Sequence, residues 1–389
     1  MFISTQIKKL QIFLVLAIVS SIAIISCNSS NNLPQFFPVQ ISEKIGFINN
    51  QGKLVIDAKF EATRIAGDAP VFSKEGLVAV RDNSKCGYID TDGKIVISFQ
   101  YDLCKQFSEG LAFVQETIKT PKQENGTTVS YQEERCSYID KLGSKVIDFN
   151  KNGFDCSSDT YKNTFSEGLS TFQMKGKIGF MDKSGKIIIQ PQFYDFGGDD
   201  GPKFSEGLAL VITSETDFRD RKVVYIDKTG KVIISANFAG ADDFSEGLAG
   251  VRYLEAGKKL FGGKGYIDTT GKIVIEPKFE SSSKFLDGLA SFTVGGKFGY
   301  IDKIGKIVVN PIYDQASLFS EGLAAVKVKD KFGFIDKTGR MVIEPTYQSV
   351  GSLHKDRRSF YNGLALVGDK DGAFGYIDKS GNYVWKPTK

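Results

Sequence analysis

After residue 40, apolar and polar positions alternate in short runs along almost the whole chain, and glycine-containing turns separate the runs. The segment Phe319–Tyr347 shows this arrangement most plainly. Alternation over four to eight residues is typical of half-buried β-strands. The pattern predicts three strands here, at Leu323–Lys329, Lys331–Ile335 and Arg340–Ile343. The segment is therefore expected to fold as a three-stranded antiparallel meander.

The second turn of this segment recurs nine times, each time as an Asp or Asn followed three residues later by Gly. Among its copies are Asp90 with Gly93, Asp268 with Gly271, Asp302 with Gly305, and Asp336 with Gly339. Asp268, Asp302 and Asp336 follow one another at a spacing of 34 residues. We take this spacing as the length of a unit without insertions, and it lies within the range of known repeat architectures. We expect an all-β chain of about nine three-stranded meanders.

The recurring aspartates have a structural explanation. An Asp that opens a turn can accept hydrogen bonds from backbone N–H groups two residues on, and the Gly that closes it can adopt the left-handed conformation. A series of catalytic or metal-binding carboxylates is the alternative, but the spacing lacks the acidic ladder of a calcium loop. We therefore interpret Asp90, Asp268, Asp302 and Asp336 as turn formers, together with their glycines.

A second recurring turn, Phe-Ser-Glu-Gly-Leu in its commonest form, precedes the first strand of eight units. The first unit lacks this turn, although Phe36–Ile41 could supply its missing strand. A three-stranded unit cannot bury both faces alone, so neighbouring units must stack. We expect an open superhelical or solenoid array. A closed propeller-like ring is the alternative; propeller blades usually have four strands and 40–45 residues, and no split terminal unit signals closure.

These patterns resemble the WG-repeat family, also described as WG-containing β repeats or KWG repeats. The resemblance rests on Gly-[Phe/Tyr]-Ile-Asp-x-x-Gly-Lys-[Ile/Val]-Val-Ile, Glu-Pro-x-[Phe/Tyr] and Phe-Ser-Glu-Gly-Leu-Ala, and it spans roughly residues 41–387. It implies a bacterial, often exported, repeat protein. One departure is the Trp position before the repeat glycine, which holds Ile45, Cys86, Ile178, Lys264, Phe298, Phe332 or Phe374.

The N-terminus predicts export. Lys8 and Lys9 precede the apolar run Leu10–Ile25, which is short for a membrane span of about twenty residues. The run ends before Cys27, so the segment resembles a bacterial lipoprotein signal peptide, which implies lipidation of Cys27. We expect residues 1–26 to be the signal, 27–35 a lipidated cysteine and tether, and 36–389 the repeat domain.

Four further cysteines, Cys86, Cys104, Cys136 and Cys156, lie in units two to four. An exported chain meets oxidising conditions, and four cysteines permit three pairings. Cys86 and Cys136 occupy equivalent repeat positions, as do Cys104 and Cys156. Repeat equivalence therefore favours the pairs Cys86–Cys104 and Cys136–Cys156.

Charge and composition bound the function. The chain has 50 Lys and Arg against 46 Asp and Glu, without a long block of one sign, so it shows no basic footprint for nucleic acid. His354 is the single histidine, which argues against a histidine-based metal centre or catalytic triad. We find no phosphate-loop, dinucleotide or hydrolase fingerprint. We expect no cofactor, no metal site and no catalytic residues.

Three units carry insertions between their first and second strands, the longest at Gln115–Arg135. Insertions that share one structural position should project from one face, where repeat proteins often bind. We predict mobile loops there. The leading hypothesis is a lipid-anchored envelope protein, on the outer membrane or cell surface, that binds an unknown protein or glycan. A structural envelope spacer or assembly component is the alternative, and a carboxylate-dependent hydrolase is third.

Overall fold

The structure is a computed structural model, and it describes residues 35–61, 70–124, 127–156, 164–194, 201–214, 222–236, 238–254, 261–351 and 359–386. The chain divides into two units, Met1–Pro34 and Gln35–Lys389, and every described residue belongs to the second. Cys27, the predicted signal peptide, most of the predicted tether and His354 lie outside the described residues. Within the described residues no helix is long and apolar enough to cross a membrane.

The described residues form nine small antiparallel sheets, which we number as blades 1 to 9 in chain order. Blades 1 to 3 contain β1 Phe37–Ile41, β2 Lys44–Ile48 and β3 Leu54–Glu61; β4 Val78–Asp82, β5 Lys85–Ile89 and β6 Ile95–Tyr101; and β7 Leu103–Cys104, β8 Ala112–Glu124, β9 Thr127–Ile139 and β10 Lys145–Asp148. The short helix α3, Phe149–Asn152, follows β10.

Blades 4 to 6 contain β11 Leu169–Met174, β12 Lys177–Asp182 and β13 Ile187–Phe193; β14 Phe204–Ser205, β15 Leu208–Ile212, β16 Val223–Ile226 and β17 Val232–Ser235; and β18 Phe238–Ala241, β19 Leu248–Leu254, β20 Phe261–Asp268 and β21 Ile273–Phe279. Blades 7 to 9 contain β22 Ser281–Ser282, β23 Ala290–Val294, β24 Lys297–Ile301 and β25 Ile307–Tyr313; β26 Gln315–Ala316, β27 Leu323–Val328, β28 Lys331–Asp336 and β29 Met341–Tyr347; and β30 Ser349–Val350, β31 Ala365–Gly368, β32 Phe374–Ile377 and β33 Tyr383–Trp385.

The predicted meander is present, with two differences. Six blades add a short strand before it, as β26 does beside β27, so these sheets have four strands. The outer strand is also longer than the apolar run predicts. In blade 8 it continues through Pro345 to Tyr347, because a strand at the edge of a sheet tolerates a residue without an N–H group.

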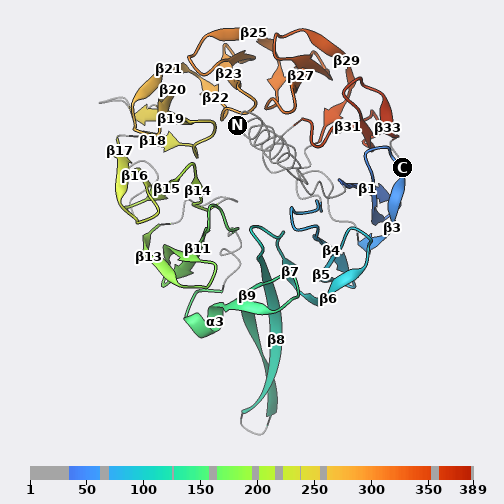
Figure 1. The fold of residues 1–389 in the computed structure, drawn as a ribbon, viewed down its shortest axis with the longest axis vertical. Helices are drawn as coiled ribbons and strands as arrows, with labels where there is room; N and C mark the ends of the chain where they lie inside the picture. Colours follow the sequence, from blue (N-terminus) through green and yellow to red (C-terminus); the bar gives the residue numbers. More distant parts are fainter. Residues whose placement is uncertain are drawn as a thin grey trace, which may run out of the picture. The chain divides into compact units, whose positions relative to one another are not determined.

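The nine blades follow one another around a closed ring, with third strands such as β13, β21, β25 and β29 on the outside (Figure 1). The prediction of an open solenoid was therefore wrong, and the closed alternative is correct. Blade 9 packs on blade 1 through a cluster that joins Phe37, Val39 and Ile48 with Leu364, Leu366 and Tyr376. The Tyr376 hydroxyl donates to the Pro38 carbonyl at 2.7 Å. Closure buries the two end faces that an open array would expose.

Ring closure needs no exchanged strand, which is why the sequence did not reveal it. The first blade is complete without the Phe-Ser-Glu-Gly turn, because β1 pairs with β2 from Phe37 opposite Ile48 to Ile41 opposite Lys44. The strand predicted at Phe36–Ile41 is thus present. Side-chain packing, rather than a split blade, joins the two ends of the array.

The Phe-Ser-Glu-Gly turns link consecutive blades from blade 2 to blade 9. The Ser166 hydroxyl of blade 4 donates to the Phe204 carbonyl of blade 5 at 2.7 Å, and the Glu167 carboxylate accepts the Gly207 N–H at 3.1 Å. Lys228 of blade 5 approaches the same carboxylate at 3.1 Å. The Gly N–H to carboxylate bond recurs from Glu75, Glu109, Glu206, Glu246, Asp287 and Glu321 to the following blade. The turn is therefore an inter-blade connection.

The Asp-x-x-Gly turns have the geometry expected of turn formers. In each of the four copies singled out above, one carboxylate oxygen accepts two backbone N–H groups, at 2.9 to 3.1 Å. Gly93, Gly271, Gly305 and Gly339 all have φ between 75° and 87°, in the left-handed region. The carboxylates are thus occupied by their own turns, and the structure does not bring them together.

These turns predict acid sensitivity. The side-chain hydrogen bond from Thr338 is the largest influence on the pKa of Asp336. Burial acts in the opposite direction, but further hydrogen bonds from Arg340 and from the backbone outweigh it, so that the pKa is lowered to about 2. A folded-state pKa below the unfolded value of 3.8 stabilises the fold fully above about pH 4, and that stabilisation disappears as the pH falls towards 2. We expect Asp336→Asn to lower the free energy of unfolding at pH 7 and to match the wild type near pH 2. Urea denaturation at both pH values measures this, and an equal deficit at both would contradict it.

Candidate interaction surface

Blade 3 differs from the other blades by a long two-stranded extension. Strands β8 and β9 pair continuously from Ala112 opposite Ile139 to Glu124 opposite Thr127. Only the part of this hairpin nearest the ring has further neighbours, and we call that part the base. Strand β7 pairs with Val114 and Gln115 of β8, and β10 pairs with Ser137 to Ile139 of β9. We call the described residues 116–124 and 127–135 the arm. It projects beyond the ring of blades (Figure 1).

The prediction of a mobile loop at Gln115–Arg135 is replaced by this β-ribbon. Most of the corresponding insertions in blades 5 and 6, at residues 215–221 and 255–260, lie outside the described residues. Side chains along the described part of the arm are largely exposed, including Lys119, Thr120, Gln132 and Tyr131, the last at 45%. The arm is thus a two-stranded ribbon that contributes little to the core.

Two disulfides hold blade 3 to both of its neighbours. Cys86 on β5 of blade 2 is bonded to Cys104 on β7 of blade 3. Cys136 on β9 is bonded to Cys156, and the adjacent Asp155 N–H donates to the Gln173 carbonyl on β11 of blade 4 at 2.7 Å. The structure therefore brings the four cysteines together in the pairs that repeat equivalence favours. Disulfides of this kind indicate an oxidising, extracytoplasmic location.

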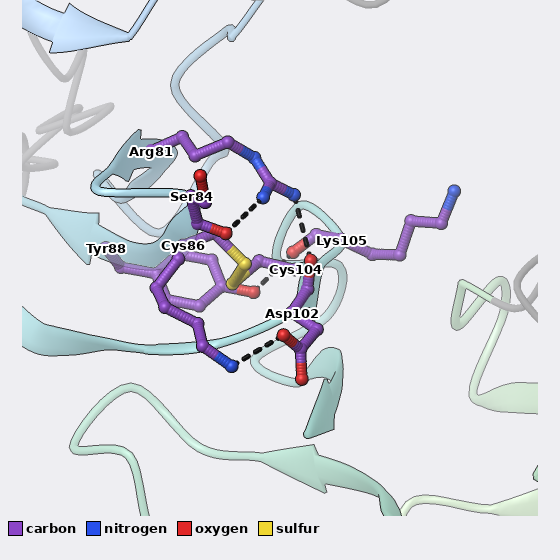
Figure 2. The surroundings of a disulfide bond; sticks show 8 residues. Arg81, Ser84, Cys86, Tyr88, Asp102, Cys104 and Lys105 are labelled. Carbon is purple, nitrogen blue, oxygen red and sulfur yellow. Dashed lines mark hydrogen bonds and ion pairs between the residues drawn. A yellow bond between two sulfur atoms is a disulfide. The ribbon is translucent and has the colours of Figure 1, made fainter. Parts of the chain in front are cut away.

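Hydrogen-bonded polar groups surround the first disulfide (Figure 2), and Asp102 among them also contacts the arm. The Arg81 guanidinium donates to the carbonyl oxygens of Ser84 at 2.7 Å and Asp102 at 2.9 Å. The Asp102 carboxylate accepts Lys85 of blade 2 at 2.5 Å and the Thr117 N–H of the arm at 2.7 Å. Partial burial acts to raise the pKa of Asp102, but these hydrogen bonds outweigh it and lower that pKa. Asp102 thus stays ionised while it bridges blade 2 and the arm.

Helix α3 fastens the other edge of the arm. It replaces the second half of the outer strand, and it begins where the Asp148 carboxylate accepts the Lys151 N–H at 3.0 Å and ends at Gly153, with φ of 71°. The Asn150 side chain donates to the Glu134 carbonyl on β9 at 3.2 Å. Both edges of the arm are therefore capped at its base, at Thr117 and at Glu134.

An aromatic cluster lies beneath the base of the arm. The Phe149 ring of α3 is fully buried and lies 5.5 Å from Phe113, 5.8 Å from Tyr138 and 5.4 Å from Phe154, centroid to centroid. Phe154 packs in turn on Phe172 of blade 4 at 4.2 Å. The Phe113–Phe149 and Phe149–Phe154 pairs are edge-to-face, a geometry that adds about 1 kcal/mol per pair beyond burial. The arm therefore stands on a rigid foundation.

Sequence reasoning located the cysteines but not the groups around them. Asp102, Asn150, Phe149 and Phe154 were missed, because their partners lie in other strands or blades. One signal was available, since residues 145–156 depart from the Glu-Pro-x-[Phe/Tyr] pattern of other outer strands. Among the described residues, no group of three or more His, Cys, Asp or Glu side chains could hold a metal ion.

Comparison with known proteins gives a family and distant structural likenesses. The model of the WG containing repeat matches residues 45–86, 87–117, 178–213, 225–254, 265–298, 298–332 and 332–372. No curated protein matches the chain.

Among solved structures, BamB from Moraxella catarrhalis has a TM-score of 0.38 at 12% identity, covering 74% of this chain and 92% of its own. PorZ, a surface component of the type-IX secretion system of Porphyromonas gingivalis, has 0.32 at 9%, covering 87% and 61%. The dihydro-heme d1 dehydrogenase NirN has 0.43 at 14%, covering 92% and 74%. At these TM-scores the likenesses carry no argument about function.

Proposed function

Because this chain belongs to the WG containing repeat family, we propose that it is an exported binding module whose ring of blades presents the arm to a protein partner. The observation that carries the proposal is the arm itself. A two-stranded ribbon without a third strand is marginally stable in water, so its length needs a purpose beyond the fold. The chain reinforces the base of this ribbon with two disulfides and an aromatic cluster.

We further propose that lipidation of Cys27 holds the module at the cell envelope, on the outer membrane or the cell surface. The sequence pattern before Cys27 supports this part of the proposal. The disulfides are consistent with it, since they need an oxidising compartment. In this role the module acts by binding and carries no reaction of its own.

Removal of the arm should separate binding from folding. Blade 7 offers the template, because its β23–β24 hairpin turns through Gly295 and Gly296 alone. Replacing residues 117–134 by two glycines should leave the thermal midpoint within about 5 °C, since Thr117–Pro121 and Ser130–Glu134 are exposed or half-buried. The same change should abolish partner binding. Retention of binding would place the partner on another surface and contradict the role of the arm.

Binding can be measured by cross-linking in intact cells. A photoreactive residue at Gln132 of the full-length protein should form a discrete protein adduct, whereas one at Lys141, in the turn between β9 and β10 at the opposite end of blade 3, should not. Added purified protein should displace the partner from the adduct or take its place in it, and the arm-deleted protein should do neither. Absence of an adduct at Gln132, or displacement of the partner by the arm-deleted protein, would overturn the proposal.

A further inference from the structure

We propose that the arm pairs edge to edge with the arm of a second copy of this chain, β9 against β9, in one antiparallel four-stranded sheet. This inference rests on the proposed function, since it names the partner of the arm. It follows from the two edges of the arm, which differ in the backbone N–H and carbonyl groups that they present to an added strand.

The capping bonds identify the backbone groups that point outward. The Thr117 N–H of β8 reaches Asp102, and the Glu134 carbonyl of β9 reaches Asn150, so both groups point away from the ribbon. Thr117 and Glu134 lie opposite each other in the register. In an antiparallel pair this orientation recurs at every second residue. The next outward-facing pairs are Lys119 with Gln132 and Pro121 with Ser130.

The β8 edge is blocked. Pro121 has no N–H group to donate to an added strand, and it stands at an outward-facing position. Lys119, the other outward-facing residue, is exposed and charged. Lysine and proline on an edge strand are recognised means of preventing strand addition. Nearer the ring, the outward N–H of Thr117 already donates to the Asp102 carboxylate.

The β9 edge is open. Ser130 and Gln132 each keep an outward N–H and an outward carbonyl, and β9 contains no proline from Thr127 to Ile139. Their side chains are exposed. Farther from the ring than Glu134, this edge therefore presents the alternating backbone donors and acceptors that an added strand requires.

One open edge and one blocked edge favour a closed pair. Two open edges would let copies add without limit, whereas a single open edge is satisfied when it meets the same edge of a second copy around a two-fold axis. Pairing Ser130 with Gln132 of the second copy places the two Tyr131 side chains opposite each other. It places Glu133 and Glu134 opposite positions 129 and 128, which carry no charge. The edge is therefore complementary to itself.

Cysteine substitution tests this pairing in the full-length protein. Directly opposite residues in a non-hydrogen-bonded pair have Cα atoms about 4.5 Å apart, within reach of a disulfide. Tyr131→Cys should therefore form a dimer in the oxidising compartment, visible on a non-reducing gel and lost on reduction. Thr120→Cys, which lies opposite Tyr131 on the blocked strand, should remain monomeric. Absence of the Tyr131→Cys dimer would overturn the proposal.

Proline substitution supplies the matched control. In the Tyr131→Cys background, Ser130→Pro should abolish the dimer, whereas Lys119→Pro should leave it intact, and both should keep the thermal midpoint of the parent. Equal loss from both prolines would contradict pairing through β9. A Gln132 adduct with a different protein and no Tyr131→Cys dimer would overturn the second copy as partner but leave the proposed function standing. Failure of both assays would overturn both proposals.

Discussion

Replacing Tyr376 by alanine should lower the free energy of unfolding by about 3–5 kcal/mol, the usual cost of removing a buried aromatic side chain. The ring of Tyr376 is buried between the terminal blades, 5.5 Å from Phe37, and its hydroxyl donates to Pro38. Tyr376→Phe removes only the hydrogen bond and should cost about 1 kcal/mol. Equilibrium denaturation in urea measures both values.

The matched control is Tyr300, which makes the equivalent bond within the array, to the Ser317 carbonyl at 2.8 Å. Tyr300→Phe should cost about as much as Tyr376→Phe, because both hydroxyls serve a closed interface. Hydrogen exchange adds a local measurement, since Tyr376→Ala should increase exchange first in blades 1 and 9. If Tyr376→Phe has no effect while Tyr300→Phe destabilises, the ring is open in solution.

Loss of either disulfide should cost about 3 kcal/mol, the value expected for closing a loop of some twenty residues in the unfolded chain. The sequence separations are 18 residues for Cys86–Cys104 and 20 for Cys136–Cys156. Each pair replaced by two alanines should show this deficit in chemical denaturation. Because both bonds connect blade 3 to a neighbour, exchange should also increase at the base of the arm.

Reduction of the wild-type protein is the control. With both bonds broken, its free energy of unfolding should match that of the variant lacking all four cysteines. A deficit below about 1 kcal/mol for either pair would show that the remaining contacts already fix the blade junction. In that case the aromatic cluster around Phe149, rather than the covalent bonds, supports the arm.

Local features of this fold could be predicted from sequence, and features that depend on distant partners could not. The turn at Asp302 and Gly305 is recognisable because its hydrogen bonds lie within five residues. The closure of the ring depends on Tyr376 and Pro38, which are 338 residues apart. Nothing in either residue's neighbourhood marks that contact, so the choice between an open and a closed array was wrong.

The arm escaped prediction for a different physical reason. Strands are recognised by the apolar face that they bury, and the side chains of Lys119–Pro121 and Ser130–Glu134 are exposed. Their pairing rests largely on backbone hydrogen bonds, which leave little trace in side-chain chemistry. Likewise Ser166 and Glu167 gave a turn signal, but their partners Phe204 and Gly207 belong to the next blade.

The head-to-tail bonding of the Phe-Ser-Glu-Gly turns also bears on how such a chain can be rearranged. Each turn needs only the Phe carbonyl and Gly N–H of its successor, and these groups are the same at one junction after another. This bonding runs from blade 2 to blade 9, whereas blade 1 lacks the turn and joins blade 9 through side-chain packing. Gain or loss of a whole repeat between blades 2 and 9 would therefore change the circumference of the ring without requiring a new kind of junction.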